Sequence, residues 1–523
     1  MYRSEKRMKG FIFIKNTLIL TVTSLLLRLA GMIFKVWTSS AVGAEGVGLY
    51  QQILSVYILA ATFASSGICT GVTRLISEQT KTTRASASAV LRKATLLTLA
   101  ASVVLGGGLF FAAPFVSKYI LGDPRTALSI KILCFSLPFK GTAACVKGYY
   151  YAKRKTVQPS LCQLFEQFVR IAVTVFFVGK FAGLGVEMLT AALLIGDTVG
   201  EISSFIYIYI AYKFEKRRLP SGGGAQKGIL REILRIALPI TGSRYIMSGL
   251  HTAESAIVPA QLTSFAHSRS TALAQFGMLK GMALPLVFFP ASFLSALSVM
   301  LLPEMSQAAA VGNKRKIKEI TRRSIGTTLI AATVVAGIFF FNAKPIGILI
   351  FGSQEVGYMI RMLSPIIPFM YLESVADGML KGLDQQTSSL FYNVADSLCR
   401  LILIFLIVSR TGITGFLVIM IISNITTSSL NTARLIKVTE SGFDLKNWVL
   451  KPLAATVVGG AAGYVAVLWL GFGGLLSTVV SVGLQAAVSF LMLIVLGCIK
   501  PFKITEMLGI KNFQKNFKNS IDK

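Results

Sequence analysis

Apolar stretches long enough to cross a bilayer recur from Phe11 almost to Ile499, and polar clusters separate them. Each crossing needs about 20 predominantly apolar residues in a helix. Taking glycines, prolines and charged clusters as boundaries, the pattern predicts about fourteen spanning helices. We expect them at 11–41, 47–76, 88–118, 126–153, 157–181, 184–213, 229–260, 270–308, 317–343, 355–382, 387–409, 412–437, 449–470 and 475–499. The pattern therefore predicts an all-α, polytopic membrane protein.

Composition agrees with a lipid environment. Hydrophobic residues make up 54% of the 523 residues and charged residues only 14%, against about 25% charged in soluble domains. The first apolar run, 11–42, is too long for a signal-peptide core of roughly 7 to 15 residues. We expect it to be retained as the first helix, and no stretch is left for a separate soluble domain.

The net charge of +31 could indicate a nucleic-acid partner, so its distribution matters. Lys and Arg fall in clusters between every second pair of apolar segments rather than in one patch. With a cytoplasmic N-terminus, roughly 36 basic residues lie inside and about 8 outside, which is the positive-inside asymmetry. The count predicts a cytoplasmic-membrane protein with both termini in the cytoplasm, and argues against nucleic-acid binding.

A charged, glycine-rich interruption at 214–228 predicts a cytoplasmic linker between two lobes, 1–213 and 229–437. Leu121-Gly122-Asp123 followed by Leu137-Pro138-Phe139 resembles Phe351-Gly352-Ser353 followed by Ile367-Pro368-Phe369, at an offset of about 230 residues. Six helices separate the copies, so the six-helix lobes should be a parallel repeat. Two additional helices at 438–499 and a basic tail at 500–523 would follow.

Cations within spanning helices are costly and usually face a protein interior or a wet cavity. Arg28 and Lys35 lie seven residues apart on one helical face, and Lys140, Arg244 and Lys280 are further cations at membrane depth. Arg and Lys bind phosphate oxygens strongly, so these five residues form a candidate site for an anionic head group. The alternative is that some of them reach toward the membrane surface instead.

Acidic residues and one histidine form a second set at membrane depth. Burial can raise the pKa of a carboxyl group, so such residues are candidates for coupling to a proton or sodium gradient or to the membrane potential. The candidates for ion coupling are Asp197, Glu201, His251, Glu254, Glu373 and Asp377. Ion pairing within the protein is the alternative, and it is favoured for Glu166 with Arg170 and for Asp396 with Arg400, each four residues apart.

The sequence offers little support for an enzyme. We find no phosphate-binding glycine loop with its lysine, no metal-type pair of histidines and no long exterior loop for a catalytic domain. The six cysteines have neither paired nor metal-type spacing. We therefore predict no catalytic residues, no metal site, no disulfide and no cofactor.

Five short motifs are distinctive: Leu27–Gly31, Val42–Gln51 and Arg74–Glu78 in the first half, and Gly281–Pro285 and Leu302–Glu304 in the second. They resemble motifs of the multidrug/oligosaccharidyl-lipid/polysaccharide exporter superfamily. Within the superfamily the chain looks most like the polysaccharide-biosynthesis, stage V sporulation protein B-like branch, which is related to lipid II flippases. The resemblance extends over essentially the whole length.

The resemblance implies two six-helix lobes, to which the flippases can add two helices, and alternating access driven by an ion gradient or membrane potential. Arg28 followed by Gly31 matches a cavity arginine of helix one in lipid II flippases, and Lys35 is the approximate counterpart of a second. Lys280 lies near the place of their helix-eight arginine. The basic residues that the flippases carry in helix two are missing from Ala61–Gly67.

From these residues and this resemblance we expect a flippase for a lipid-linked oligosaccharide or a peptidoglycan precursor, such as one for the spore cortex, in a bacterial cytoplasmic membrane. A cation-coupled multidrug exporter of the same fold is the first alternative. A membrane scaffold or glycan-polymerising enzyme is another. The expected partners are the lipid-linked substrate, membrane lipids and enzymes of cell-wall synthesis, and a monomer is favoured.

Overall fold

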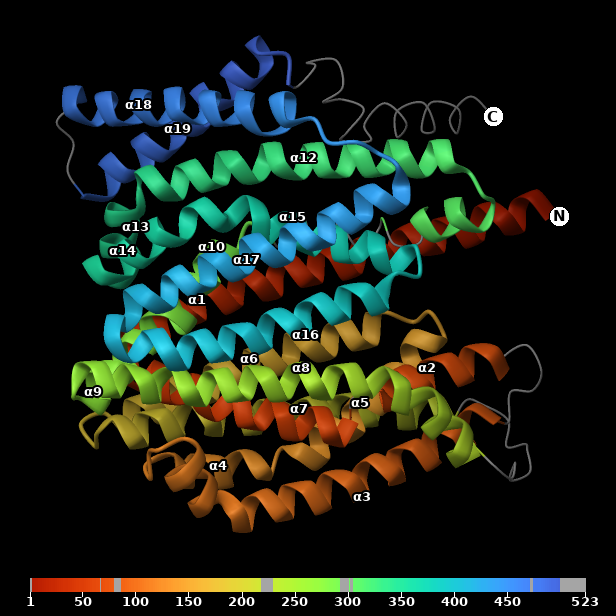
Figure 1. Cartoon of the computed structure of the whole chain (residues 1–523). Helices are drawn as coiled ribbons and strands as arrows, with labels where there is room; N and C mark the ends of the chain where they lie inside the picture. The colour runs from red at the N-terminus through yellow and green to blue at the C-terminus, as the bar shows by residue number, and fades with distance from the viewer. Residues whose placement is uncertain are drawn as a thin grey trace. The chain divides into compact units, whose positions relative to one another are not determined.

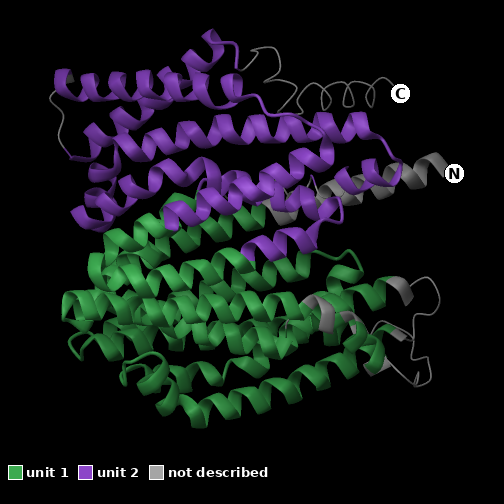
Figure 2. Ribbon diagram, in the orientation of Figure 1, with its two compact units in different colours: residues 1–289, 394–419 green, residues 290–393, 420–523 purple. Residues whose placement is uncertain are grey.

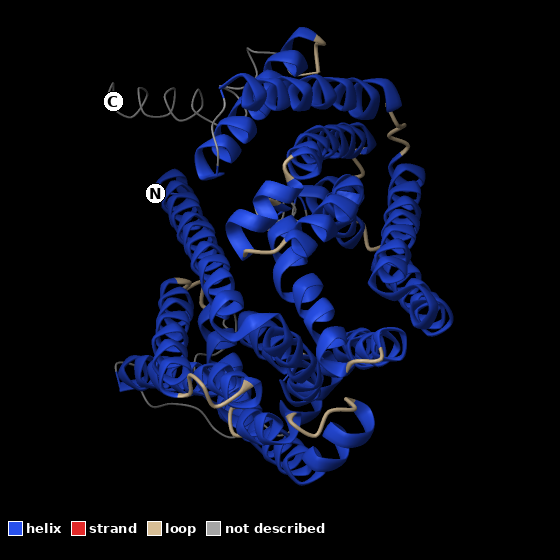
Figure 3. Ribbon diagram, turned by 90° about the vertical axis from the view of Figure 1, so that its left-hand side faces the viewer, coloured by secondary structure: helices blue, strands red, loops and turns tan. Residues whose placement is uncertain are grey.

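The computed structural model describes residues 2–65, 67–79, 86–217, 229–291, 301, 304–470 and 474–498. Within these ranges all regular secondary structure is helical (Figure 3). The predicted all-α class is therefore confirmed. Most of the linker predicted at 214–228, and the tail predicted at 500–523, lie outside the described residues.

The first half of the chain forms seven α-helices and one π-helical turn within the described ranges (Figure 1). They are α1 (Tyr2–Ser65), α2 (Ile68–Gln79), α3 (Ser86–Phe115), η1 (Val116–Ile120), α4 (Thr126–Cys134), α5 (Leu137–Ala152), α6 (Val157–Lys180) and α7 (Val186–Arg217). The helix expected at 126–153 is thus two pieces, α4 and α5, bent by 41°. Pro138 stands in the first turn of α5, where proline is tolerated.

The second half begins with α8 (Ile229–Ala266), α9 (Arg269–Gly277), the π-helical η2 (Met278–Ala283) and α10 (Leu284–Phe288). It continues with α12 (Lys314–Phe341), α13 (Ala343–Phe351), α14 (Gln354–Leu363), η3 (Ser364–Ile366), α15 (Ile367–Gly382), α16 (Gln386–Leu403) and η4 (Ile404–Val408). It closes with α17 (Ser409–Thr439), η5 (Lys446–Leu450), α18 (Lys451–Leu470) and α19 (Gly474–Val495). Part of the helix predicted at 270–308 lies outside the described residues.

Over the described residues, nine helices are long and apolar enough to cross a membrane, or ten if α4 and α5 form one bent span. Large apolar side chains are exposed on these helices, among them Phe111 at 83% and Trp469 at 88%. Such exposure suits hydrocarbon and not water. The chain is a multi-pass membrane protein, and the total of about fourteen spans stays a prediction.

The break expected between 41 and 47 is present inside α1. Gly43 has φ 77° and ψ 168°, a conformation that glycine adopts without the steric penalty of a side chain. Two residues further on, the Glu45 carboxylate accepts hydrogen bonds from Arg125 (2.8 Å) and Ser270 (2.5 Å). Glu45 therefore joins α1 to the loop before α4 and to the start of α9.

Two segments at the offset predicted for the internal repeat share their backbone features. Gly122 and Gly352 both have positive φ, at 68° and 65°, just before α4 and α14 respectively. The helices α5 and α15 then begin at the predicted Leu-Pro-Phe and Ile-Pro-Phe motifs and each have 16 residues. A residue with positive φ follows each helix, Arg154 at 57° and Asp384 at 60°.

The chain divides into two compact units (Figure 2). Unit 1 comprises residues 1–289 and 394–419, and unit 2 comprises residues 290–393 and 420–523. The predicted lobe boundaries at 213, 229 and 437 stay a prediction.

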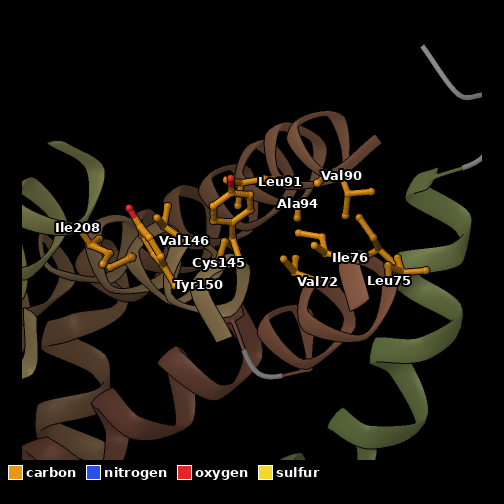
Figure 4. Packing of buried hydrophobic residues seen from close by; sticks show 14 of the residues in the cluster. Val72, Leu75, Ile76, Val90, Leu91, Ala94, Cys145, Val146, Tyr150 and Ile208 are labelled. Carbon is orange, nitrogen blue, oxygen red and sulfur yellow. The ribbon is translucent and has the colours of Figure 1, made fainter. Parts of the chain in front are cut away.

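One core of unit 1 joins α2, α3, α5 and α7 (Figure 4). Ile76 of α2, Val90 of α3 and Ile208 of α7 are each 0% exposed within it, and Tyr150 of α5 is 1% exposed. A Cβ atom on Gly148 of α5 would lie only 3.0 Å from the Cys69 carbonyl oxygen of α2. The missing side chain therefore lets α5, which carries Lys140 and Lys147, pack closely on α2.

Candidate functional site

Six charged side chains from α5, α6 and α7 meet inside unit 1. We call them the six-charge cluster: Lys140 and Lys147 of α5, Glu166 and Arg170 of α6, and Asp197 and Glu201 of α7. Three carry a positive and three a negative charge. Because buried charges are costly unless paired, this balance is what an apolar interior requires.

The pairs within the six-charge cluster cross from helix to helix. Lys140 Nζ lies 2.5 Å from Glu201 Oε1, and Lys147 Nζ lies 3.4 Å from Glu166 Oε2. The predicted pair within α6 is confirmed, since Arg170 Nη2 lies 2.9 Å from Glu166 Oε1. These contacts assign a carboxylate partner to Lys140, one of the cations expected at a head-group site.

Arg170 also extends the six-charge cluster to α7 and, through it, to α1. Its Nε lies 3.0 Å from Asp197 Oδ1, and Tyr50 Oη of α1 donates a hydrogen bond to Asp197 Oδ2 at 2.8 Å. Asp197 is therefore held by a cation from one side and a hydroxyl group from another. The spacing of charged residues gave no indication of Tyr50, because its contact comes from a distant helix.

Small residues bring α6 and α7 close enough for these pairs. A Cβ atom on Gly196 of α7 would overlap Thr174 Oγ1 of α6, and one on Gly200 would lie 3.2 Å from Arg170 Cβ. Close approach through small residues is common where helices associate in membranes. The two glycines thus set the distance across which Arg170 reaches Asp197.

A second charged site of unit 1 surrounds Glu254 of α8, whose side chain is only 4% exposed. Lys280 Nζ of η2 lies 2.7 Å from Glu254 Oε1, and Arg400 Nη2 of α16 lies 3.2 Å from Glu254 Oε2. We call these three residues the Glu254 triad. One carboxylate is shared by two cations, so the triad has a formal charge of +1, unlike the balanced six-charge cluster.

The position of Lys280 follows from tight packing of α9 and η2 against α1. A Cβ atom on Gly277 would overlap the Ala44 carbonyl oxygen, and one on Gly281 would overlap Val47 Cγ1. Lys280 itself stands within the π-helical turn η2, and such turns occur frequently at functional sites. The sequence placed Lys280 and Glu254 in separate roles, whereas the structure places them in contact.

The remaining expected cations of unit 1 are exposed on their helices. Arg28 and Lys35 are exposed on α1, and Arg244 is exposed on α8, as is His251 one turn before Glu254. An exposed charge on an apolar spanning helix faces a wet cavity or reaches toward the membrane surface. The structure brings none of these four into the six-charge cluster.

In unit 2, Asp377 of α15 contacts residues that are close to it in the sequence. Its carboxylate accepts from Lys381 Nζ at 2.5 Å, one turn along the same helix, and from Ser389 Oγ at 2.9 Å. Glu373, one turn earlier, is half-buried. Pairing with a cation inside the protein was the alternative to ion coupling, and Lys381 is such a partner for Asp377.

Unit 2 also contains an apolar cavity of about 710 Å³ between α12, α15, α17 and α18. None of the described residues around it is charged. Its apolar lining includes Phe340, Phe369, Leu372, Ile436, Leu453 and Val457. A cavity of this chemistry suits a hydrocarbon chain and not a sugar or a phosphate.

Comparison with known families adds to this geometry. The family model described as "Polysaccharide biosynthesis protein" matches residues 13–309, more than half of the chain. The MatE family model matches residues 263–406. The two matches overlap at the segment that contains Lys280.

Individual proteins of the same kind are similar to the chain over most of its length. Stage V sporulation protein B of Bacillus subtilis (strain 168) is 22% identical over 459 residues, which cover 86% of this chain and 88% of that protein. Lipid II flippase MurJ of the same organism is 20% identical over 426 residues, covering 75% and 76%. A solved structure of lipid II flippase MurJ, in an inward closed conformation, has a TM-score of 0.70 at 13% identity and covers 92% and 98%. At that identity the likeness shows a shared fold.

Proposed function

The chain belongs to the polysaccharide biosynthesis protein family of the multidrug/oligosaccharidyl-lipid/polysaccharide exporter superfamily, and we propose that it flips a lipid-linked saccharide across the cytoplasmic membrane. The superfamily consists of transporters and not enzymes. The proposed cargo is a lipid-linked oligosaccharide or a peptidoglycan precursor, lipid II-like, for the spore cortex. The similar proteins named for sporulation and for lipid II flipping support this choice.

The observation that carries the proposal is the excess positive charge of the Glu254 triad. Lys280 and Arg400 converge on one carboxylate, so a phosphate or pyrophosphate oxygen could take the place of a Glu254 oxygen and keep both charge-assisted contacts. The six-charge cluster offers no such surplus, since each of its cations already has a carboxylate. The exposed Arg28, Lys35 and Arg244 would add positive charge along the path of the head group.

The lipid part of the cargo needs a different environment. The apolar cavity of about 710 Å³ in unit 2 has no charged lining among the described residues and would accept a polyprenyl tail. Burial of hydrocarbon contributes about 25 cal/mol per Å². A hydrocarbon chain buried in this cavity of unit 2 would therefore gain affinity from it.

Ion coupling is proposed for the acidic candidates. Protonation of Asp197 would remove the carboxylate that Arg170 contacts at 3.0 Å, which leaves the six-charge cluster with an excess cation. Glu201, which is paired with Lys140, would act in the same way. His251, Glu373 and Asp377 stay candidates, and Glu254 would couple ion binding to the head-group site itself.

The proposed architecture has about fourteen spans in two six-helix lobes plus two helices, with both termini in the cytoplasm. The matching backbone features before and after α5 and α15 support the parallel repeat. Alternating access between the lobes would move the cargo, with energy from an ion gradient or the membrane potential. Cell-wall synthesis enzymes are proposed partners, and a monomer is favoured.

A second candidate function is cation-coupled export of drug-like organic cations. The MatE model match at 263–406 favours it, because that segment contains the carboxylates Glu373 and Asp377, which could attract a cation. An organic cation would need exposed carboxylates, whereas Glu254 and Asp197 are both buried and paired with cations. The described charges therefore favour the anionic cargo.

The test is translocation of a fluorescent lipid-linked saccharide pyrophosphate by purified protein in liposomes, with and without an imposed membrane potential. Arg400→Gln should slow transport about tenfold or more, because a hydrogen bond to a charged group is worth about 1.5–3 kcal/mol. Lys316→Ala, which removes an exposed cation of α12, is the matched control and should transport normally. Uptake of organic cations without movement of the lipid would reject the flippase in favour of the second candidate.

A further inference from the structure

A second large cavity of unit 2, about 930 Å³, has a strongly basic end. Four cations of α12 line it, Arg315, Lys318, Arg322 and Arg323, with Glu319 as the one acidic residue among the described lining residues. We propose that this basic-ended groove binds an anionic phospholipid of the surrounding bilayer. The site is separate from the apolar cavity proposed for the cargo and does not depend on the identity of that cargo.

The groove has the polarity of a phospholipid along its length. After the basic residues, the lining of α12 becomes apolar at Ile330 and Val334, and Phe490 and Leu493 of α19 form part of the opposite wall. A helix rises 1.5 Å per residue, so Arg323 and Val334 are about 16 Å apart along the axis. That length is close to half of a hydrocarbon core of about 30 Å. The apolar section therefore fits the acyl chains of one leaflet.

A tryptophan marks the change from polar to apolar lining. Trp448 of η5 lines the groove, and the Arg322 guanidinium lies 6.0 Å from the centre of its ring. Gly326 permits this position, because a Cβ atom there would lie 2.7 Å from Trp448 Nε1. Tryptophan is enriched at the level of lipid head groups. The ring thus indicates where a head group would end and its acyl chains begin.

The charge of the groove selects among occupants. Four cations and one carboxylate leave an excess of three positive charges, and Arg and Lys bind phosphate oxygens strongly. The last described residue of the chain, Cys498, also lines the groove, so the segment that follows is an alternative occupant to a lipid. Residues 499–523 contain six lysines against two acidic residues and would be repelled. Basic pockets on the cytoplasmic side of membrane proteins bind anionic lipid head groups.

Thermal unfolding of the purified full chain in detergent tests the charge requirement. Phosphatidylglycerol should raise Tm more than phosphatidylcholine does, and Arg315→Ala combined with Lys318→Ala should abolish the difference. Lys314→Ala removes a cation of the same helical turn that does not line the groove, and it should keep the difference. Equal shifts with the two lipids, or a difference that survives in the double variant, would overturn the proposal.

Fluorescence tests the location and needs no change to the basic residues. The chain has three tryptophans, so Trp37→Phe with Trp469→Phe leaves Trp448 as the reporter. Phosphatidylglycerol with brominated acyl chains should quench its emission at lower concentrations than brominated phosphatidylcholine, and added salt should weaken the preference. Restoring Trp469, which is 88% exposed, supplies a control that both lipids should quench. Absence of quenching by phosphatidylglycerol, or equal quenching by both lipids at every concentration, would overturn the proposal.

Discussion

The Arg400 guanidinium lies 3.2 Å from the Glu254 carboxylate, which Lys280 contacts from another side at 2.7 Å. The three residues come from α16, α8 and η2, so the contact joins segments that are distant in the sequence. A buried carboxylate with two cations is stable only while the charges remain together. The proposed cargo would act on this arrangement by competing with Glu254 for its partners.

Removing either charge alone from the Glu254–Arg400 pair should destabilise the protein. Glu254→Gln should lower the free energy of unfolding by about 3 kcal/mol, since two buried cations lose the carboxylate that they share. Arg400→Gln should cost less, because Glu254 keeps its contact with Lys280. The double variant should regain part of that loss without regaining transport. Unfolding in detergent and the liposome assay measure the two effects. Transport by the double variant at the wild-type rate would remove Arg400 from the proposed site.

Asp197→Asn should change the ion dependence of transport. The substitution removes the charge that Arg170 contacts at 3.0 Å but keeps an acceptor for Tyr50. Tyr50→Phe is the matched control, because it removes only the hydrogen bond and should cost about 1 kcal/mol of stability. Transport rates measured against proton and sodium gradients distinguish the two variants. An unchanged ion dependence in Asp197→Asn would assign Asp197 to structure alone.

Gly196→Ala should separate α6 from α7. The added Cβ atom would overlap Thr174 Oγ1, so we expect a loss of about 1–3 kcal/mol, typical of overpacking. Gly179→Ala, on α6 with open space around the new atom, is the control and should leave Tm nearly unchanged. Equal thermal unfolding of the two variants would show that the close approach of the helices does not stabilise the protein.

A buried hydrogen-bond network should hold α19 against the end of α12. Asn342 Nδ2 donates to Gln485 Oε1 at 2.7 Å, and Ser481 Oγ donates to Asn342 Oδ1 at 2.7 Å. Asn342→Leu should cost about 1–2 kcal/mol, because Gln485 and Ser481 lose a buried partner. Asn424→Leu, which loses a bond of 2.8 Å to its own helix, should cost less in the same unfolding measurement. The reverse order would contradict a role for the network in holding α19.

Sequence periodicity predicted which residues share a helical face, and this was enough for the Glu166–Arg170 pair. It could not predict the ion pairs Lys140–Glu201 and Arg400–Glu254, because spacing along one helix contains no information about the neighbouring helix. The break between α4 and α5 had a local signal that the prediction did not use, Pro138 in the first turn of α5. The break at Gly43 was anticipated because glycine was treated as a boundary.

The difference in charge between the two sites of unit 1 has an electrical consequence. Moving one elementary charge through the whole membrane field involves about 2.3 kcal/mol per 100 mV. The six-charge cluster, with three charges of each sign, could change depth with almost no electrical work. The Glu254 triad has one positive charge in excess, so any motion that carries it across the field would be assisted or opposed by the resting potential. A pyrophosphate bound there would reverse the sign of that work.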